Sequence, residues 1–156
     1  MAEKDSGVWQ QKNYGAEGLA AIEAAVAGTK VDRKQLDDLD EEIAACVETP
    51  DSDTVKRWTR LASGLGNKLR KLASRLEASV RNAESNRYVE ILFECDRDGK
   101  KFTDGAAKMD ASSYVSEIRK ARNLFIGYVE SCDKILTMCR MNLDQQGLDQ
   151  RNDVSV

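Results

Sequence analysis

Histidine is absent from the 156-residue sequence, and proline occurs only once, as Pro50. Histidine is the commonest general base near neutral pH and the commonest neutral metal ligand, so its absence argues against Ser-His-Asp triads and most zinc sites. Carboxylate pairs remain, such as Glu41 with Glu42 or Asp96 with Asp98, but no flanking motif orients them for acid–base catalysis. We therefore expect a protein that is not an enzyme, with no catalytic residues and no cofactor.

The cysteines also argue against metal and redox chemistry. None of the four, Cys46, Cys95, Cys132 and Cys139, forms a CxxC pair. Cys132 and Cys139 are seven residues apart, which places them on one helix face, where reduced cysteines commonly pack as small core residues. No apolar run follows a basic start, and no stretch approaches the roughly 18 apolar residues of a membrane span. We expect a reduced, cytoplasmic protein without a bound metal and without membrane contact.

Helical periodicity dominates the remaining pattern and predicts an all-α fold. From residue 53 to about 95 the pattern is continuously helical. Within it, apolar residues recur in alternating steps of three and four, the spacing of a coiled-coil-like seam, at Val55, Trp58, Ala62, Leu65, Leu69, Leu72 and Leu76; the next step, of four to Val80, is a stutter. The same alternation continues from residue 104 to 142, through Ala107, Ala111, Tyr114, Ile118, Ala121, Phe125, Tyr128, Cys132, Ile135 and Cys139. We predict a long antiparallel hairpin made of a basic helix (53–95), a turn (96–103) and a second long helix (104–142).

Two shorter helices are predicted before the hairpin. An alanine-rich segment ends at Gly28, and a second helix begins at Asp32, with Gln35 at the reciprocal capping position, and stops at Pro50. Short helices need a partner surface, so we expect both to pack on the hairpin. This gives a single domain over residues 15–143, between a flexible N-terminus (1–14) and a disordered tail (144–156).

The apolar face of the last helix is wider than one facing helix covers, which indicates self-association or a protein partner. Either the N-terminal helices or further copies of the chain must cover the remainder. We expect the oligomer or partner face to comprise Tyr114, Ile118, Phe125, Tyr128 and Ile135.

The stretch DRDGKKFTDGAA, residues 96 to 107, has the look of a ligand-binding loop. A calcium loop starting at Asp96 would need oxygen ligands at its fifth and twelfth positions and glycine at its sixth, but lysines occupy the fifth and sixth and alanine the twelfth. A phosphate-binding loop would need more glycines. We predict a turn in which Gly99 is left-handed, Thr103 caps the next helix and Phe102 packs on Ala107.

The charge is unevenly distributed along the chain. Residues 1–54 carry 13 acidic and 5 basic side chains, residues 55–87 carry 9 basic and 2 acidic, and residues 88–156 carry 10 basic and 12 acidic, although the whole chain has a net charge of only -3. A strongly basic segment inside an acidic chain is a candidate binding region. Helical spacing places five of its cations in one row: Arg57, Arg60, Lys68, Lys71 and Arg75.

Two interpretations of this row remain open. In the first, the cations contact the phosphates of a single-stranded nucleic acid while Tyr88 stacks on a base. In the second, they pair with the acidic N-terminal helices, where DDLDEE supplies the anions, or with a protein partner.

The order of features resembles a known family. A basic helix ending in Arg87 and Tyr88, a short polar loop and a second long helix starting with TDGAAK are similar in layout to the phage recombination-mediator proteins of the UvsY type, over about residues 55–142. That resemblance implies a small, helical, oligomeric protein that binds single-stranded DNA in the cytoplasm of a bacterial host. We therefore expect a helical accessory protein that binds single-stranded nucleic acid. The alternative is a coiled-coil assembly adaptor that recognises a protein partner.

Overall fold

The computed structural model describes residues 20, 22 and 24–153, with their side chains as far as residue 147. The helices with defined bounds are α2 (Lys30–Ala45), α3 (Ser52–Arg97), α4 (Asp104–Tyr114) and α5 (Ser116–Asp153). Residues 20, 22 and 24–28 are also helical, and a turn at Thr29 separates them from α2. Helices alone make up the regular structure of the described residues, which confirms the all-α prediction. The predicted flexible segment 1–14 lies outside the described residues.

The longest element is α3, which has 46 residues and therefore a length of about 69 Å. Its N-cap is Asp51, whose carboxylate accepts hydrogen bonds from the backbone N–H groups of Asp53 at 2.9 Å and Thr54 at 2.8 Å. It ends just before Gly99, which has a φ of +63°. The left-handed Gly99 that the sequence predicts is therefore confirmed, because a helix commonly stops at such a glycine.

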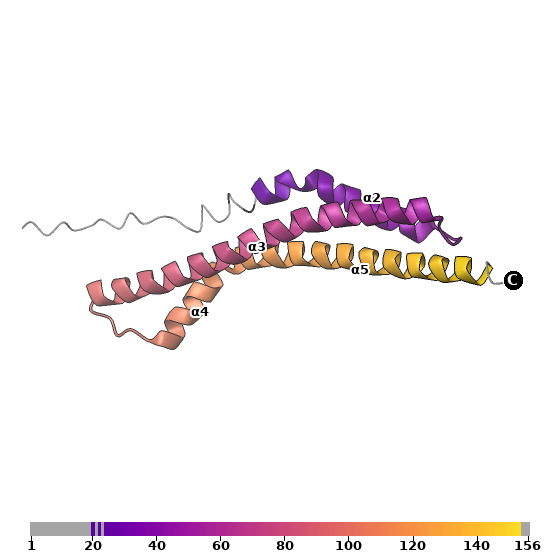
Figure 1. Cartoon of the computed structure of the whole chain (residues 1–156). Helices are drawn as coiled ribbons and strands as arrows, with labels where there is room; N and C mark the ends of the chain where they lie inside the picture. Colours follow the sequence, from indigo (N-terminus) through magenta and orange to yellow (C-terminus); the bar gives the residue numbers. More distant parts are fainter. Residues whose placement is uncertain (1–19, 21, 23, 154–156) are drawn as a thin grey trace, which may run out of the picture.

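Antiparallel to α3, and beside it, lies α5 (Figure 1). The two helices approach closely at Gly66, where an added Cβ would lie 3.2 Å from the Cβ of Cys132. Cys132 and Cys139 are fully buried between them, as the sequence predicts for core cysteines. Most residues of the two predicted seams are likewise buried in this hairpin core.

The predicted partner face on the last helix is wrong for three of its five residues. Ile118, Phe125 and Ile135 are 5%, 0% and 6% exposed, because they face α3 and belong to the core of the chain itself. Tyr128 packs against the same core, and only Tyr114 is exposed. Periodicity marks an apolar helix face, but it does not say whether the chain or a partner covers that face.

A third layer covers only part of the hairpin. Leu36 and Leu39 of α2 are buried in the core, and Ile22 and Val26 of the preceding helical residues pack against it. Figure 1 shows these segments over the first part of α3, with no described helix over its end. We call the three-layered part, around residues 52–83 of α3, the proximal half. The distal half comprises residues 84–97 of α3, the loop 98–103 and α4.

The second arm of the hairpin is broken, contrary to the prediction of one helix over residues 104–142. It stops at Tyr114 and restarts at Ser116, so that α4 leans away from the line of α5 (Figure 1). Val115, at the break, is fully buried. The surrounding sequence SSYVS is rich in serine and β-branched or aromatic residues, which are weak helix formers and commonly accompany kinks.

Two further predictions about the ends of helices are wrong. Thr103 stands at the start of α4 but makes no side-chain capping bond. The tail predicted to be disordered from residue 144 is helical as far as Asp153. Leu143 packs against the core, and Gln146 Nε2 donates a hydrogen bond to the Pro50 carbonyl at 2.6 Å, which holds this end on the hairpin.

A candidate binding face on α3

Two cations of the predicted row pair with α2. Arg57 forms an ion pair with Glu42, whose carboxylate also accepts a hydrogen bond from Trp58 Nε1 at 2.8 Å. Hydrogen bonds from Arg57 and then Trp58 lower the pKa of Glu42 below its ordinary value of 4.5. The pairing of the basic helix with an acidic N-terminal helix, one of the two interpretations, is thus present at Arg57.

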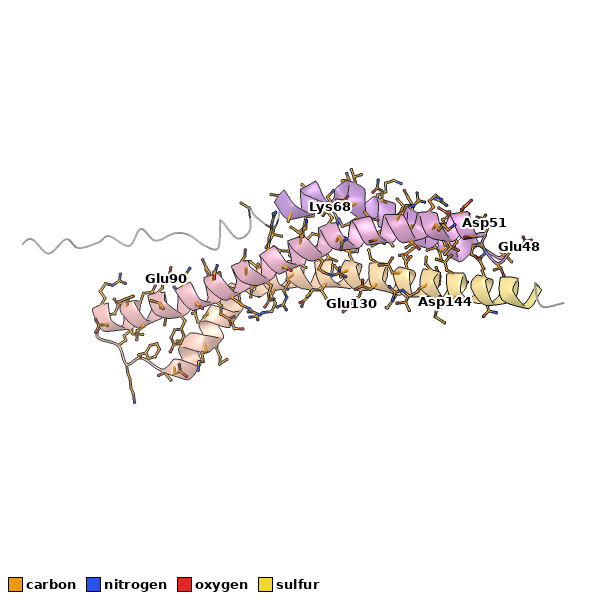
Figure 2. All side chains as sticks on the ribbon, viewed as in Figure 1. Glu48, Asp51, Lys68, Glu90, Glu130 and Asp144 are labelled. Atoms are coloured by element: carbon orange, nitrogen blue, oxygen red, sulfur yellow. The ribbon has the colours of Figure 1, made fainter. Side chains whose placement is uncertain are left out.

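The second pair joins Lys68, which is labelled on α3 in Figure 2, to Asp32 of α2. Lys68 Nζ donates to Asp32 Oδ1 at 2.8 Å and lies 2.7 Å from Oδ2. Asp32 is only 6% exposed, whereas the lysine side chain remains largely in solvent. The predicted capping role of Asp32 is therefore wrong, because α2 starts two residues earlier at Lys30 and the carboxylate turns toward α3 instead.

The remaining three cations of the row have no ion-pair partner among the described residues. Arg60, Lys71 and Arg75 are exposed. They follow one another at intervals of 11 and four residues, close to three turns and one turn, so they share one face of α3 over about 22 Å. We call these three residues the open row.

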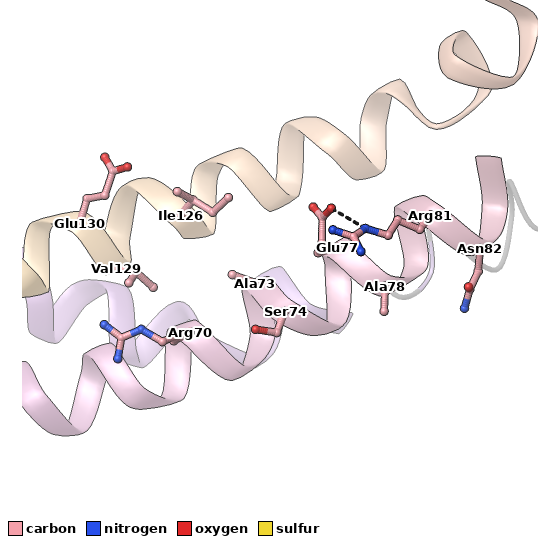
Figure 3. A pocket seen from close by; sticks show the side chains of 10 residues that line it. All are labelled: Arg70, Ala73, Ser74, Glu77, Ala78, Arg81, Asn82, Ile126, Val129 and Glu130. Carbon is pink, nitrogen blue, oxygen red and sulfur yellow. Dashed lines mark hydrogen bonds and ion pairs between the residues drawn. The ribbon is translucent and has the colours of Figure 1, made fainter. Parts of the chain in front are cut away.

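A shallow groove between α3 and α5 adjoins the open row. It has a volume of about 630 Å³, and no residue of α2 lines it. Its lining, shown in Figure 3, comprises Arg70, Ala73, Ser74, Glu77, Ala78, Arg81, Asn82, Ile126, Val129 and Glu130. Lys71 precedes Ser74 by three residues and Ala78 by seven, so it stands beside this groove on the same helix face.

Two arginines at the groove extend the cationic surface. Arg70 donates to Asp133 of α5 at 2.9 Å, and Arg81 donates to Glu77 at 3.0 Å, yet half or more of each arginine side chain is exposed. Glu77 also bonds Arg122 of α5 at 2.6 Å. Sequence reasoning did not single out Arg70 and Arg81, although both lie in the basic segment. Which side of α3 stays open is decided by where α2 packs.

Tyr88, predicted to stack on a base, instead helps to close the distal half. Its hydroxyl donates to Asp104 Oδ1 at 2.7 Å, and its ring meets Phe102 edge-on at a centroid distance of 5.8 Å. The hydrogen bond to Asp104 raises the pKa of the Tyr88 phenol. Phe102 thus contacts Tyr88, a partner that the sequence had not indicated.

Arg87, next to Tyr88, links α3 to α4. Its guanidinium bonds Asp110 at 3.0 Å, Glu94 at 3.2 Å and Glu90 at 3.4 Å, and lies over the Tyr114 ring. Three carboxylates around a cation that is only about one-fifth exposed leave it little capacity for a ligand.

Metal and membrane sites are not evident in the part of the chain that the structure describes. No group of His, Cys, Asp or Glu in these residues is arranged to hold a metal ion. Within the same residues, each helix is too short or too polar to cross a bilayer. Burial raises the pKa of the Cys132 thiol, which disfavours the reactive thiolate.

The comparisons with known proteins found no matching family model, no matching curated protein and no matching solved structure. The class of protein therefore rests on its fold and surface chemistry: it is an all-α hairpin protein with a partly open cationic face.

Proposed function

We propose that this chain is a non-enzymatic accessory protein that binds single-stranded nucleic acid through the open row and the groove beside it. The observation that supports this most is the exposure of Arg60, Lys71 and Arg75 on one face, without partners among the described residues. An unpaired row of cations about 22 Å long suits a flexible phosphate backbone. The layout similarity to UvsY-type mediators is consistent with this role and with a location in the bacterial cytoplasm.

The binding mode follows from what the row contains. It holds cations and no aromatic side chain, so it contacts phosphates and has little sequence preference. Three phosphate contacts on a single strand give a slope of about -2 for log affinity against log salt concentration. Arg57 and Lys68, already paired with α2, contribute less than the three residues of the open row.

A charge-reversal experiment tests the proposal. Fluorescence anisotropy with a labelled single-stranded oligonucleotide is measured at several salt concentrations for the natural protein and for the double variant Lys71→Glu with Arg75→Glu. We expect the double variant to lose binding by more than tenfold at low salt. The matched control is Lys101→Glu with Arg140→Glu, which changes net charge equally at two exposed cations that also lack partners among the described residues.

The control double variant should bind nearly as well as the natural protein. Absence of binding by the natural protein at low salt, or equal loss in both double variants, rejects the proposal.

A second candidate function is assembly with a protein partner through the distal half. The observation that favours it is that Val89, Leu92, Phe93 and Met109 are 45%, 42%, 59% and 77% exposed within this short region. Clustered exposed apolar residues commonly mark protein contacts. Light scattering discriminates the two candidates: an assembly that forms without nucleic acid and is insensitive to Lys71→Glu with Arg75→Glu favours the adaptor.

A further inference from the structure

Two exposed apolar side chains of the distal half stand in line with the open row. Phe93 is 59% exposed and Val89 is 45% exposed, one helical turn apart. Val89 follows Lys71 by 18 residues. Phe93 follows Arg75 by the same number. Because 18 residues make five complete helical turns, the two cations and the two apolar residues share one face of α3, about 27 Å apart. We call Val89 and Phe93 the distal pair.

The face between the two cations and the distal pair is open and uncharged. At helical spacing it carries Ala78, Asn82 and Asn86, of which the first two are exposed and the third is partly exposed. Figure 1 shows α2 and the helical residues before it over the first part of α3 only. A phosphate backbone that leaves Arg75 is therefore not repelled along this part of the helix, and asparagine side chains can donate hydrogen bonds to it.

A second groove connects the open row to the distal pair. It lies between α3 and α4 with a volume of about 790 Å³, and Arg81, Val89 and Lys108 are among its lining residues. Arg81 also lines the groove beside the open row, so the two grooves meet at that arginine. The hollow along α3 therefore continues into the distal half as far as Val89, one turn before Phe93.

The small area of the distal pair favours a nucleobase over a protein as its occupant. Val89 and Phe93 together expose less than about 300 Å². Each partner in a stable protein–protein interface buries about 800 Å². Leu92 stands about 100° around the helix from Phe93, and Met109 belongs to α4, so neither is in line with the cations. A single base, by contrast, is close in size to one phenylalanine ring and stacks on it whatever its sequence, because every base has a π-face.

The spacing along α3 also suits a single strand. A separation of about 27 Å corresponds to about eight stacked nucleotides at roughly 3.4 Å each. Compact sites for single strands cover about 4–16 nucleotides. One strand can therefore contact the cations and the distal pair at the same time.

We propose that Phe93 is a base-stacking residue of the nucleic-acid site and that Val89 supports the stacked base. This inference rests on the proposed function and extends it: phosphates lie on Lys71 and Arg75, and a base further along the strand lies on the Phe93 ring. Phe93 takes the role that the sequence predicts for Tyr88, whose ring is held by Phe102 and whose hydroxyl is held by Asp104.

Substitutions at Phe93 test the stacking contact by fluorescence anisotropy with a labelled single-stranded oligonucleotide. Phe93→Leu keeps an apolar side chain but removes the ring, so affinity should fall by at least about fivefold. Phe93→Trp keeps a ring and should bind at least as well as the natural protein. The matched control is Leu92→Ala, which changes the neighbouring apolar residue, 42% exposed and out of line with the cations, and should leave affinity unchanged.

Two further measurements separate stacking from charge. Phe93→Leu should leave the slope of log affinity against log salt concentration unchanged because no phosphate contact is lost, whereas Lys71→Glu with Arg75→Glu should flatten it. An oligonucleotide made entirely of abasic nucleotides keeps its phosphates and should bind the natural protein and Phe93→Leu equally. A loss of affinity for this abasic strand in Phe93→Leu overturns the proposal.

Failure of this inference is distinguishable from failure of the proposed function. If the natural protein does not bind the single strand at low salt, both are rejected. If it binds and Lys71→Glu with Arg75→Glu weakens it, but Phe93→Leu does not or Leu92→Ala weakens it equally, only the stacking role of Phe93 is overturned. Loss of a protein assembly in light scattering by Phe93→Leu, with unchanged nucleic-acid affinity, also overturns that role and assigns the distal pair to a protein partner.

Discussion

In the proximal half, α3 packs against α5 on one side and α2 on another, whereas the distal half of α3 packs mainly against α4 and reaches α5 through the Glu84–Arg119 ion pair at its start (Figure 1). The side chains differ accordingly. Leu69 and Phe125 are fully buried in the proximal half, while Phe93 and Met109 are mostly exposed in the distal half. The distal half is held instead by polar contacts, chiefly those of Arg87 and Tyr88.

This difference indicates a division of roles. Burial of apolar area in the proximal half supplies most of the folding free energy, because each buried large side chain contributes about 1.5–3 kcal/mol. Exposed ion pairs contribute roughly 0–1 kcal/mol each, so the distal half adds less stability and leaves more surface for contacts.

The largest expected effect comes from truncating one apolar side chain in each half and comparing the losses of stability. Leu69→Ala removes a fully buried side chain from three-layer packing and should cost about 2–5 kcal/mol of unfolding free energy. Val89→Ala, at a 45% exposed site, should cost less than about 1 kcal/mol. Urea unfolding followed by circular dichroism measures both, and equal losses would contradict the division.

The attachment of α2 is tested by two lysines that are three residues apart. Lys68→Met leaves the buried Asp32 carboxylate without its partner and should cost about 1–3 kcal/mol. Lys71→Met removes an exposed cation without a described partner and should change stability by no more than about 0.5 kcal/mol. Thermal unfolding of the two variants provides the measurement. If Lys68→Met leaves the stability unchanged, the attachment of α2 does not depend on this ion pair.

Two nearby glycines test the close approach of α3 and α5. Alanine gains about 1 kcal/mol of helix propensity at either site. At Gly64, where an added Cβ meets nothing within 4 Å, Gly64→Ala should raise stability by that amount. At Gly66 the new Cβ would press on the Cys132 Cβ, which is fixed to the α5 backbone, so Gly66→Ala should lose the gain or become destabilising. Equal stabilisation by both substitutions would show that the helices can separate at no cost.

The smallest expected effect is a pH dependence at Glu42. Arg57 and Trp58 lower the pKa of Glu42 in the folded protein. Its contribution to the unfolding free energy is therefore complete above the ordinary glutamate pKa of 4.5, and is lost as pH falls through the lower folded pKa. The change is small because the Glu42 side chain is 41% exposed. Acid titration of Trp58 fluorescence in a Trp9→Phe background, with and without Glu42→Gln, measures it; the same titration curve in both proteins would rule the contribution out.

Much of the fold follows from local sequence alone. The apolar spacing from Val55 to Leu76 predicts α3, and Gly99 predicts its end, because a helix face and a left-handed glycine are properties of neighbouring residues. The break at Val115 was not predicted, because the apolar steps run through it without interruption. Leu143 and Gln146 extend α5 through contacts with distant residues, which local pattern does not report.

For the candidate site, the sequence by itself determined that α3 carries a row of cations, since the 3.6-residue period places Arg57, Arg60, Lys68, Lys71 and Arg75 on one face. It also determined that an acidic helix precedes that row. Only the tertiary structure decided that α2 forms ion pairs with Arg57 and Lys68. The other three cations, Arg60, Lys71 and Arg75, remain exposed. The physical reason is that ion pairs between segments depend on how two helices dock, and docking is set by the burial of Leu36 and Leu39 rather than by the charges themselves.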